Sequence, residues 1–147
     1  MPQNQAIAGI ILAAGSSSRM GRPKQLLPYR GKVLLQHVVD LVGSVDFLQR
    51  VIVLGHAASE IQTRCITNGY TVRYNPDYAR GHSTSIKIGL EILDSRVQGA
   101  IFFLADQPLV KASTIQDLTR EYVRTGASIA VPVYQGRRGN PVFFHRR

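Results

Sequence analysis

The sequence predicts an α/β fold: a three-layer, Rossmann-like, mostly parallel sheet. Apolar stretches of strand length alternate with amphipathic segments along the whole chain. The strand-like stretches are rich in Ile, Val and Phe and do not alternate apolar with polar residues, as expected of strands buried on both faces. One helical segment separates each pair of strands, which is typical of crossovers between parallel neighbours. Ligands of such sheets bind at the carboxyl ends of the strands.

Each element follows from its local pattern. The first strand (residues 6–13, AIAGIILA) is apolar throughout, and a helix (33–42) with closely spaced Leu and Val follows it. The next strands, RVIVL (50–54) and YTVRY (70–74), flank a second helical segment at 59–67. A third helix at 83–93 repeats Ile86, Leu90 and Leu93 at helical spacing and leads into GAIFFLA (99–105). A fourth helix (114–124) and the strand SIAVPVY (128–134) come next.

The last apolar segment, NPVFF (140–144), predicts one further strand, and the sequence stops three residues later. Two interpretations remain open: a domain that is complete with this strand at its edge, or a chain that ends before its natural boundary. Length and composition fit one compact domain, because 44% of 147 residues are hydrophobic. The single cysteine, Cys65, cannot form an internal disulfide and has no zinc-binding spacing.

The distribution of charge predicts an anionic partner. The net charge is +9, and the first acidic residue is Asp40, preceded by five basic residues: Arg19, Arg22, Lys24, Arg30 and Lys32. Nucleic acid is disfavoured, because the basic residues lie in turns without interleaved aromatic residues and no RNA- or DNA-binding motif is present. A small phosphorylated ligand fits better. No apolar run could span a membrane and no signal peptide is recognisable, so the sequence indicates a cytoplasmic protein without membrane contact.

The loop after the first strand is a candidate phosphate site of unusual type. It matches neither the P-loop spacing nor GxGxxG. Instead a strand runs into a turn of small residues (13–15), where backbone N–H groups can approach a ligand. Serines 16–18 add hydroxyl donors, and Arg19 and Lys24 add charge without a carboxylate nearby in sequence, as a polyphosphate requires. The alternative is a solvated basic loop.

The segment LAAGSSSRMGRPKQLLPYRGKVLL resembles the signature LAAGxSxRMGxxKxLL of nucleotidyltransferases. The similarity is strongest to the molybdenum-cofactor family of MobA-like NTP transferases, and within it to the cytidylyl-transferring branch, because LAAG stands where guanylyl-transferring relatives usually have LAGG. NPDYARGHSTSIKIGL, FFLADQPLV and GRRGNPVFF follow in the family's order, so the resemblance extends over essentially the whole chain. It implies a turn that wraps an NTP.

The resemblance assigns roles to individual residues. It implies backbone contacts to the nucleotide from Leu12, Ala13, Ala14 and Gly15. It implies that Lys24 holds the phosphates with Arg19 beside it, and that Asp106 binds Mg²⁺. The position of Asp106 supports this independently, since AIFFLAD places a lone carboxylate where the ligands of the sheet bind, and a cation bridging phosphates takes one or two protein carboxylates. A turn or capping role for Asp106 is the alternative.

The second loop is less specific. Gly81 allows a bend, and Ser83 and Ser85 are candidates either for nucleotide contact or for capping the following helix. His56 ends the second strand, where it either faces the pocket or has a structural role. The Ala14 methyl, where other relatives have glycine, predicts a preference for a smaller pyrimidine base.

The resemblance implies transfer of CMP from CTP to molybdopterin with release of pyrophosphate. Two departures are noted. Family members continue through a further segment with a second metal-binding aspartate that this chain (1–147) lacks, and Asn140 stands where histidine is common. A fragment, a swapped assembly and a binding protein without turnover are all left open. The alternatives are a sugar-phosphate or other alcohol-phosphate nucleotidyltransferase, and a non-catalytic carrier that delivers the cofactor to a molybdoenzyme.

Overall fold

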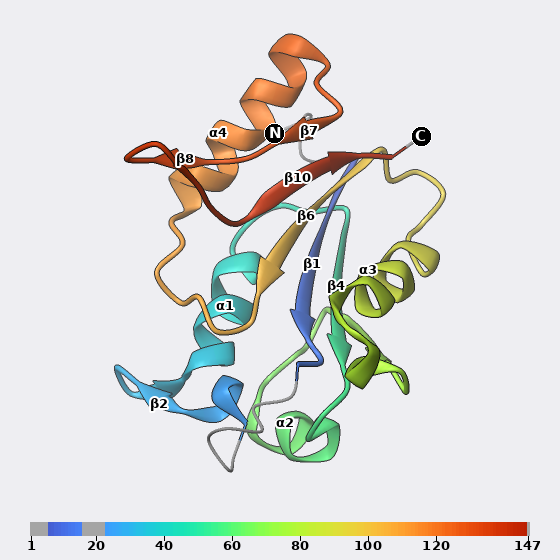
Figure 1. Ribbon diagram of the computed structural model, residues 1–147, viewed down its shortest axis with the longest axis vertical. Helices are drawn as coiled ribbons and strands as arrows, with labels where there is room; N and C mark the ends of the chain where they lie inside the picture. The colour runs from blue at the N-terminus through green and yellow to red at the C-terminus, as the bar shows by residue number, and fades with distance from the viewer. Residues whose placement is uncertain (1–5, 16–22, 147) are drawn as a thin grey trace.

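The central feature of the computed structural model, which describes residues 6–15 and 23–146, is a six-stranded sheet. Its strand order is β5-β4-β1-β6-β10-β7 (Figure 1). The strands are β5 (Thr71–Tyr74), β4 (Gln49–Leu54), β1 (Ile7–Ala13), β6 (Gly99–Leu104), β10 (Val142–His145) and β7 (Ile129–Ala130). The first four in this order are parallel, and β10 is antiparallel to both of its neighbours. The predicted three-layer, mostly parallel fold is therefore confirmed.

Among the described residues, four α-helices connect the strands, close to the predicted positions: α1 (Leu34–Gly43), α2 (Ala58–Arg64), α3 (His82–Glu91) and α4 (Ala112–Thr125). The sequence pattern did not predict the short elements. These are the 3₁₀ helices η2 (Lys24–Leu26) and η3 (Tyr78–Arg80), and the small hairpins β2 (Pro28–Tyr29) with β3 (Lys32–Val33) and β8 (Val133–Tyr134) with β9 (Arg137–Arg138). None of the helices within 6–15 and 23–146 is long and apolar enough to cross a membrane.

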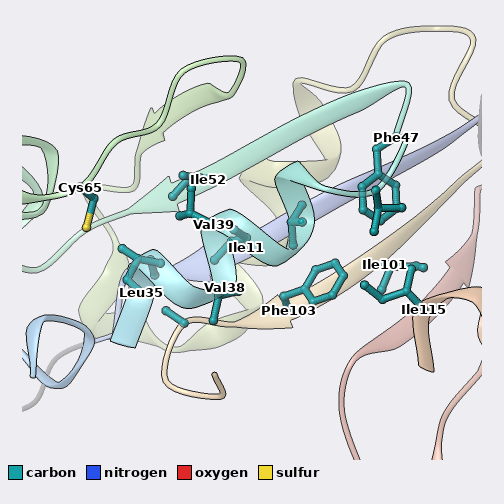
Figure 2. Close-up of a cluster of buried hydrophobic side chains, with 14 of the residues drawn as sticks. Ile11, Leu35, Val38, Val39, Phe47, Ile52, Cys65, Ile101, Phe103 and Ile115 are labelled. Atoms are coloured by element: carbon teal, nitrogen blue, oxygen red, sulfur yellow. The ribbon is translucent and has the colours of Figure 1, made fainter. Parts of the chain in front are cut away.

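The helices divide the core into two clusters, one on each face of the sheet. Helices α1, α2 and α4 contribute to the larger cluster, and α3 covers the opposite face (Figure 1). Figure 2 shows Leu35 and Val38 of α1 beside Ile11 of β1 in the larger cluster, with Phe103 of β6 and Ile115 of α4 farther along it. Burying each such side chain contributes about 1.5–3 kcal/mol to the stability of the fold. The packing of helices on both faces therefore stabilises the sheet.

β1 explains the absence of apolar–polar alternation. All seven of its residues are buried, and it pairs with β4 on one side and β6 on the other. Ile11 belongs to the cluster under α1, whereas Ile10 and Leu12 belong to the cluster under α3. Both faces of the strand are therefore interior.

The carboxyl-terminal third differs from the sequence prediction. The expected strand 128–134 is divided into β7 and β8, which belong to different sheets, because Pro132 has no N–H to donate to a ladder and the chain turns away there. One of the two interpretations of the last apolar segment placed it at the edge of the sheet, and the structure does not place it there. After the β8–β9 hairpin the chain returns between β6 and β7, where Phe143 is fully buried, and β7 forms the edge.

Candidate active site

The connectivity of the sheet places a topological switch point at the carboxyl ends of β1 and β6. From β1 the chain proceeds outward to β4 and then β5, and it returns to the other side of β1 to form β6. In α/β sheets of this type, ligands bind outside the carboxyl ends of the strands at such a switch point. The turn after β1, with Ala14 and Gly15, lies here together with Asp106, two residues beyond β6.

Lys24 and Asp106 meet at this switch point. Lys24 begins η2, and its Nζ lies 3.8 Å from Oδ2 of Asp106, with 55% and 40% of the two side chains exposed. The expectation that Lys24 has no acidic neighbour, which rested on proximity in sequence, is therefore wrong. Solvent-exposed pairs of this kind stabilise a fold by at most about 1 kcal/mol. The pair leaves both charges accessible to a ligand that carries phosphate and a cation.

The turn itself is held from below by Gln25. This side chain is 5% exposed, and its Nε2 donates to the carbonyl oxygens of Ala13 and Gly15, each at 3.2 Å. Sequence reasoning did not select Gln25, because a glutamine between a lysine and two leucines carries no local signal of burial. Leu12, Ala13 and Ala14 are buried and Gly15 is exposed, so the turn reaches the surface at Gly15.

The Ala14 methyl lies in the core. Ala14 is 3% exposed, and a Cβ on Gly55 would lie 2.9 Å from the Ala14 Cβ and 2.5 Å from the Tyr78 Cβ. The methyl is thus enclosed on the α3 side of the sheet, and any effect on base preference has to act through the backbone. His56 donates its backbone N–H to the Ala14 oxygen at 3.2 Å, and its ring lies 5.9 Å from that of Tyr78, centroid to centroid.

The second loop combines one exposed and one buried serine. Gly81 has a positive φ of 115° and precedes α3, and no side chain caps this helix. Ser83 is exposed. Ser85 is 3% exposed, and its hydroxyl accepts a hydrogen bond of 2.8 Å from Nδ2 of the fully buried Asn75. The capping alternative for the two serines is therefore wrong, and Asn75 joins the end of β5 to α3.

The remaining predicted parts of the site are the basic loop and the metal ligand. Arg19 and serines 16–18 lie outside the described residues. Within the part of the chain that the structure describes, no group of three or more His, Cys, Asp or Glu side chains is arranged to hold a metal ion. Asp106 therefore does not belong to a preformed cluster of three such side chains in this part of the chain. A cation that keeps most of its water and binds to phosphate oxygens needs no such cluster from the protein.

The comparison with known families is decisive. A family model described as the MobA-like NTP transferase domain matches residues 9–147. The chain belongs to this family. The match includes the turn after β1, Lys24 and Asp106, and it makes the chain a nucleotidyltransferase domain.

Solved structures agree with this assignment. The homologue of Mycobacterium tuberculosis Rv0371c from Mycobacterium sp. strain JC1 is similar with a TM-score of 0.87 and 32% identity, over 97% of this chain and 71% of that one. Rv0371c of M. tuberculosis H37Rv, in a complex with manganese, is similar with a TM-score of 0.80 and 32% identity, over 96% and 71% of the two chains.

A curated relative is much longer. The bifunctional protein GlmU of Exiguobacterium sibiricum is 28% identical over 124 residues, which are 83% of this chain. The chain spans 27% of the length of that protein. The shared part supports the nucleotidyltransferase type of the domain and leaves the nucleotide and the acceptor to be argued from the site.

Proposed function

We propose that the protein transfers CMP from CTP to the terminal phosphate of molybdopterin and releases pyrophosphate. The observation that carries this proposal is the convergence of Lys24 and Asp106, 3.8 Å apart, beside the turn after β1. A phosphate oxygen of the acceptor attacks the α-phosphorus of CTP, and the bond to the β-phosphate breaks. The acceptor oxygen is already nucleophilic, so positioning and charge supply the catalysis.

Each residue at the switch point has a part in this scheme. The backbone of Leu12, Ala13, Ala14 and Gly15 contacts the nucleotide, and Gly81 and the exposed Ser83 approach it from the second loop. The buried Ser85 hydroxyl, also predicted to contact the nucleotide, is hydrogen-bonded to Asn75 instead. Lys24 exchanges its contact with Asp106 for the β- and γ-phosphates and neutralises the departing pyrophosphate. The family resemblance assigns Arg19, which lies outside the described residues, to the same phosphates. Asp106 would hold Mg²⁺, which would supply positive charge to offset that of the phosphates. The manganese complex of Rv0371c supports a divalent cation as the cofactor.

The choice of CTP and molybdopterin rests on the LAAG motif and on the family's molybdenum-cofactor branch. Thermal shifts with CTP and GTP at equal concentration and fixed Mg²⁺ test the base. We expect a larger shift with CTP, because stabilisation follows RT ln(1 + [L]/Kd) and reaches about 2.7 kcal/mol at a ligand concentration of 100 Kd. Equal shifts with both nucleotides would reject the cytidylyl assignment.

Pyrophosphate release tests the reaction and separates the alternatives. We expect release from CTP to depend on molybdopterin. Release that depends instead on a sugar phosphate would favour a sugar-phosphate nucleotidyltransferase. Tight binding of the molybdenum cofactor without pyrophosphate release would indicate a carrier that serves a molybdoenzyme.

A further inference from the structure

Gln25 has no role in the scheme above, although its amide is buried directly beneath the turn. Nε2 donates to two carbonyl oxygens, those of Ala13 and Gly15. A primary amide has two hydrogens, so this pair of bonds uses both. Oε1 of the same amide is buried and accepts no hydrogen bond from the described residues. The amide is therefore oriented so that Nε2 makes both of its hydrogen bonds, while Oε1 is left without a partner.

Packing alone does not account for a glutamine at this position. A buried acceptor without a partner costs roughly 1–3 kcal/mol, whereas methionine has a similar length and shape and carries no such cost. The amide group is favoured here only if its two donated hydrogen bonds matter. They cross the turn from the last residue of β1 to Gly15.

The two bonds determine which backbone groups face the switch point. A carbonyl oxygen that points at a phosphate repels it, whereas an N–H attracts it. The hydrogen bonds from Gln25 keep the carbonyl oxygens of Ala13 and Gly15 pointing toward the buried amide. Because a trans peptide directs its C=O and N–H to opposite sides, the N–H of Ala14 is turned away from Gln25. The amide thus orients the turn for an anionic ligand.

Gln25 also connects the turn to the phosphate-binding lysine. Lys24, Gln25 and Leu26 form the single turn of η2. Leu26 is 4% exposed and belongs to the larger core cluster. The buried side chains of Gln25 and Leu26 therefore both fix η2 against the rest of the fold. One short element therefore carries the ammonium group that faces Asp106 and the amide that holds the turn.

We propose that Gln25 is a positioning residue, which keeps the turn after β1 in its nucleotide-binding shape and in register with Lys24. This inference rests on the proposed nucleotide site. Gln49 provides a matched control at the opposite end of the sheet. Its Nε2 donates to the Ile92 oxygen at 3.1 Å and its Oε1 accepts from the Asp94 N–H at 2.7 Å, so it also ties backbone segments together.

The test measures calorimetric binding of CTP with Mg²⁺ to four variants: Gln25→Met, Gln25→Glu, Gln49→Met and Gln49→Glu. We expect Gln25→Met to raise the Kd roughly ten-fold, as for loss of one to two hydrogen bonds. Gln25→Glu should raise it further, since a carboxylate places oxygens against two carbonyls. Both Gln49 variants should lower the Tm and leave the Kd within about two-fold of the wild-type value.

The outcomes separate the inference from the function on which it rests. A wild-type protein that binds no nucleoside triphosphate refutes the proposed function, and the positioning role with it. If the wild-type protein binds CTP, an unchanged Kd in the Gln25 variants overturns the inference. Equal losses of affinity in the Gln25 and Gln49 variants overturn it as well, because they would reflect stability alone.

A second measurement requires no variant and remains valid if a substitution prevents folding. The side-chain amide signals of Gln25 and Gln49 are followed by NMR in the wild-type protein during titration with CTP and Mg²⁺. We expect the Gln25 signals to shift with saturation and the Gln49 signals to stay in place. Gln25 signals that do not respond to a bound nucleotide overturn the positioning role.

Discussion

Arg50 and Arg146, at the amino ends of the central sheet, have different partners from Lys24 at the carboxyl ends. At the amino ends, Arg50 donates to the backbone oxygens of Val42 and Val45 at 3.2 and 2.6 Å. Arg146, at the end of the antiparallel β10, donates at 2.7 Å to the backbone oxygen of Asp94. These guanidinium groups satisfy carbonyls at the ends of helices and loops, so their role is structural.

At the carboxyl ends, a basic side chain faces a carboxylate and solvent. Lys24 lies 3.8 Å from Asp106, and both side chains are substantially exposed. The comparison shows that the net charge of +9 is not one functional feature. A cation that donates to backbone oxygens is needed by the fold, whereas one that faces an exposed carboxylate at a switch point is available to a ligand.

Asp106→Asn should produce the largest effect at the carboxyl ends. The neutral amide is a poor ligand for a hard cation, so we expect turnover of CTP to fall at least about a hundred-fold. The Tm should hardly change, because only an exposed ion pair is lost. Pyrophosphate release at several Mg²⁺ concentrations measures the effect. Retained turnover with an unchanged Mg²⁺ requirement would mean that the metal is held elsewhere.

Arg50→Met, at the amino ends, should lower the stability of the fold and leave CTP binding unchanged. Two charge-assisted hydrogen bonds are lost and two carbonyl oxygens lose a donor, so we expect the free energy of unfolding to fall by about 2–3 kcal/mol. Urea denaturation measures the change, and CTP affinity should stay at the wild-type value. A variant with unchanged stability would show that these contacts contribute nothing net.

Lys24→Met should weaken ligand binding with little effect on stability, which is the reverse of the effect expected for Arg50→Met. Loss of a charged contact to phosphate should weaken CTP binding by about 1.5 kcal/mol, the lower part of the usual range, because Lys24 has to leave Asp106 when phosphate binds. The free energy of unfolding should change by less than about 1 kcal/mol. Calorimetry and urea denaturation separate the two quantities. Unaltered CTP affinity in the folded variant would remove the phosphate role.

The smallest effect is expected at Asp94, near the amino ends. Hydrogen bonds from the Arg96 side chain and backbone N–H hold the pKa of Asp94 at about 2, below its usual value of 3.8. A depressed pKa in the folded state contributes stability above the unfolded pKa, and this is lost as pH falls through the folded value. Wild-type protein should thus exceed Asp94→Asn slightly in stability at pH 6, and the two should converge between about pH 4 and 2. A constant difference would contradict this linkage.

Local pattern in the sequence was sufficient for the fold class and for most elements. Uninterrupted apolar strands such as β1 and amphipathic segments such as α1 and α4 have few other ways to bury their apolar surface, so a doubly covered parallel sheet follows from their order. The same order places Asp106 at a strand end. These features depend on neighbours within a few residues and are visible without coordinates.

Tertiary structure alone decided which distant residues meet. The contact of Lys24 with Asp106, the burial of Gln25 beneath the turn, and the enclosure of the Ala14 methyl depend on how β1, β6 and η2 pack together. The place of β10 between β6 and β7 depends likewise on pairing between strands distant in sequence. Side-chain identity specifies what a group can donate or accept, but its partner is set by packing across the sheet, which no local pattern records.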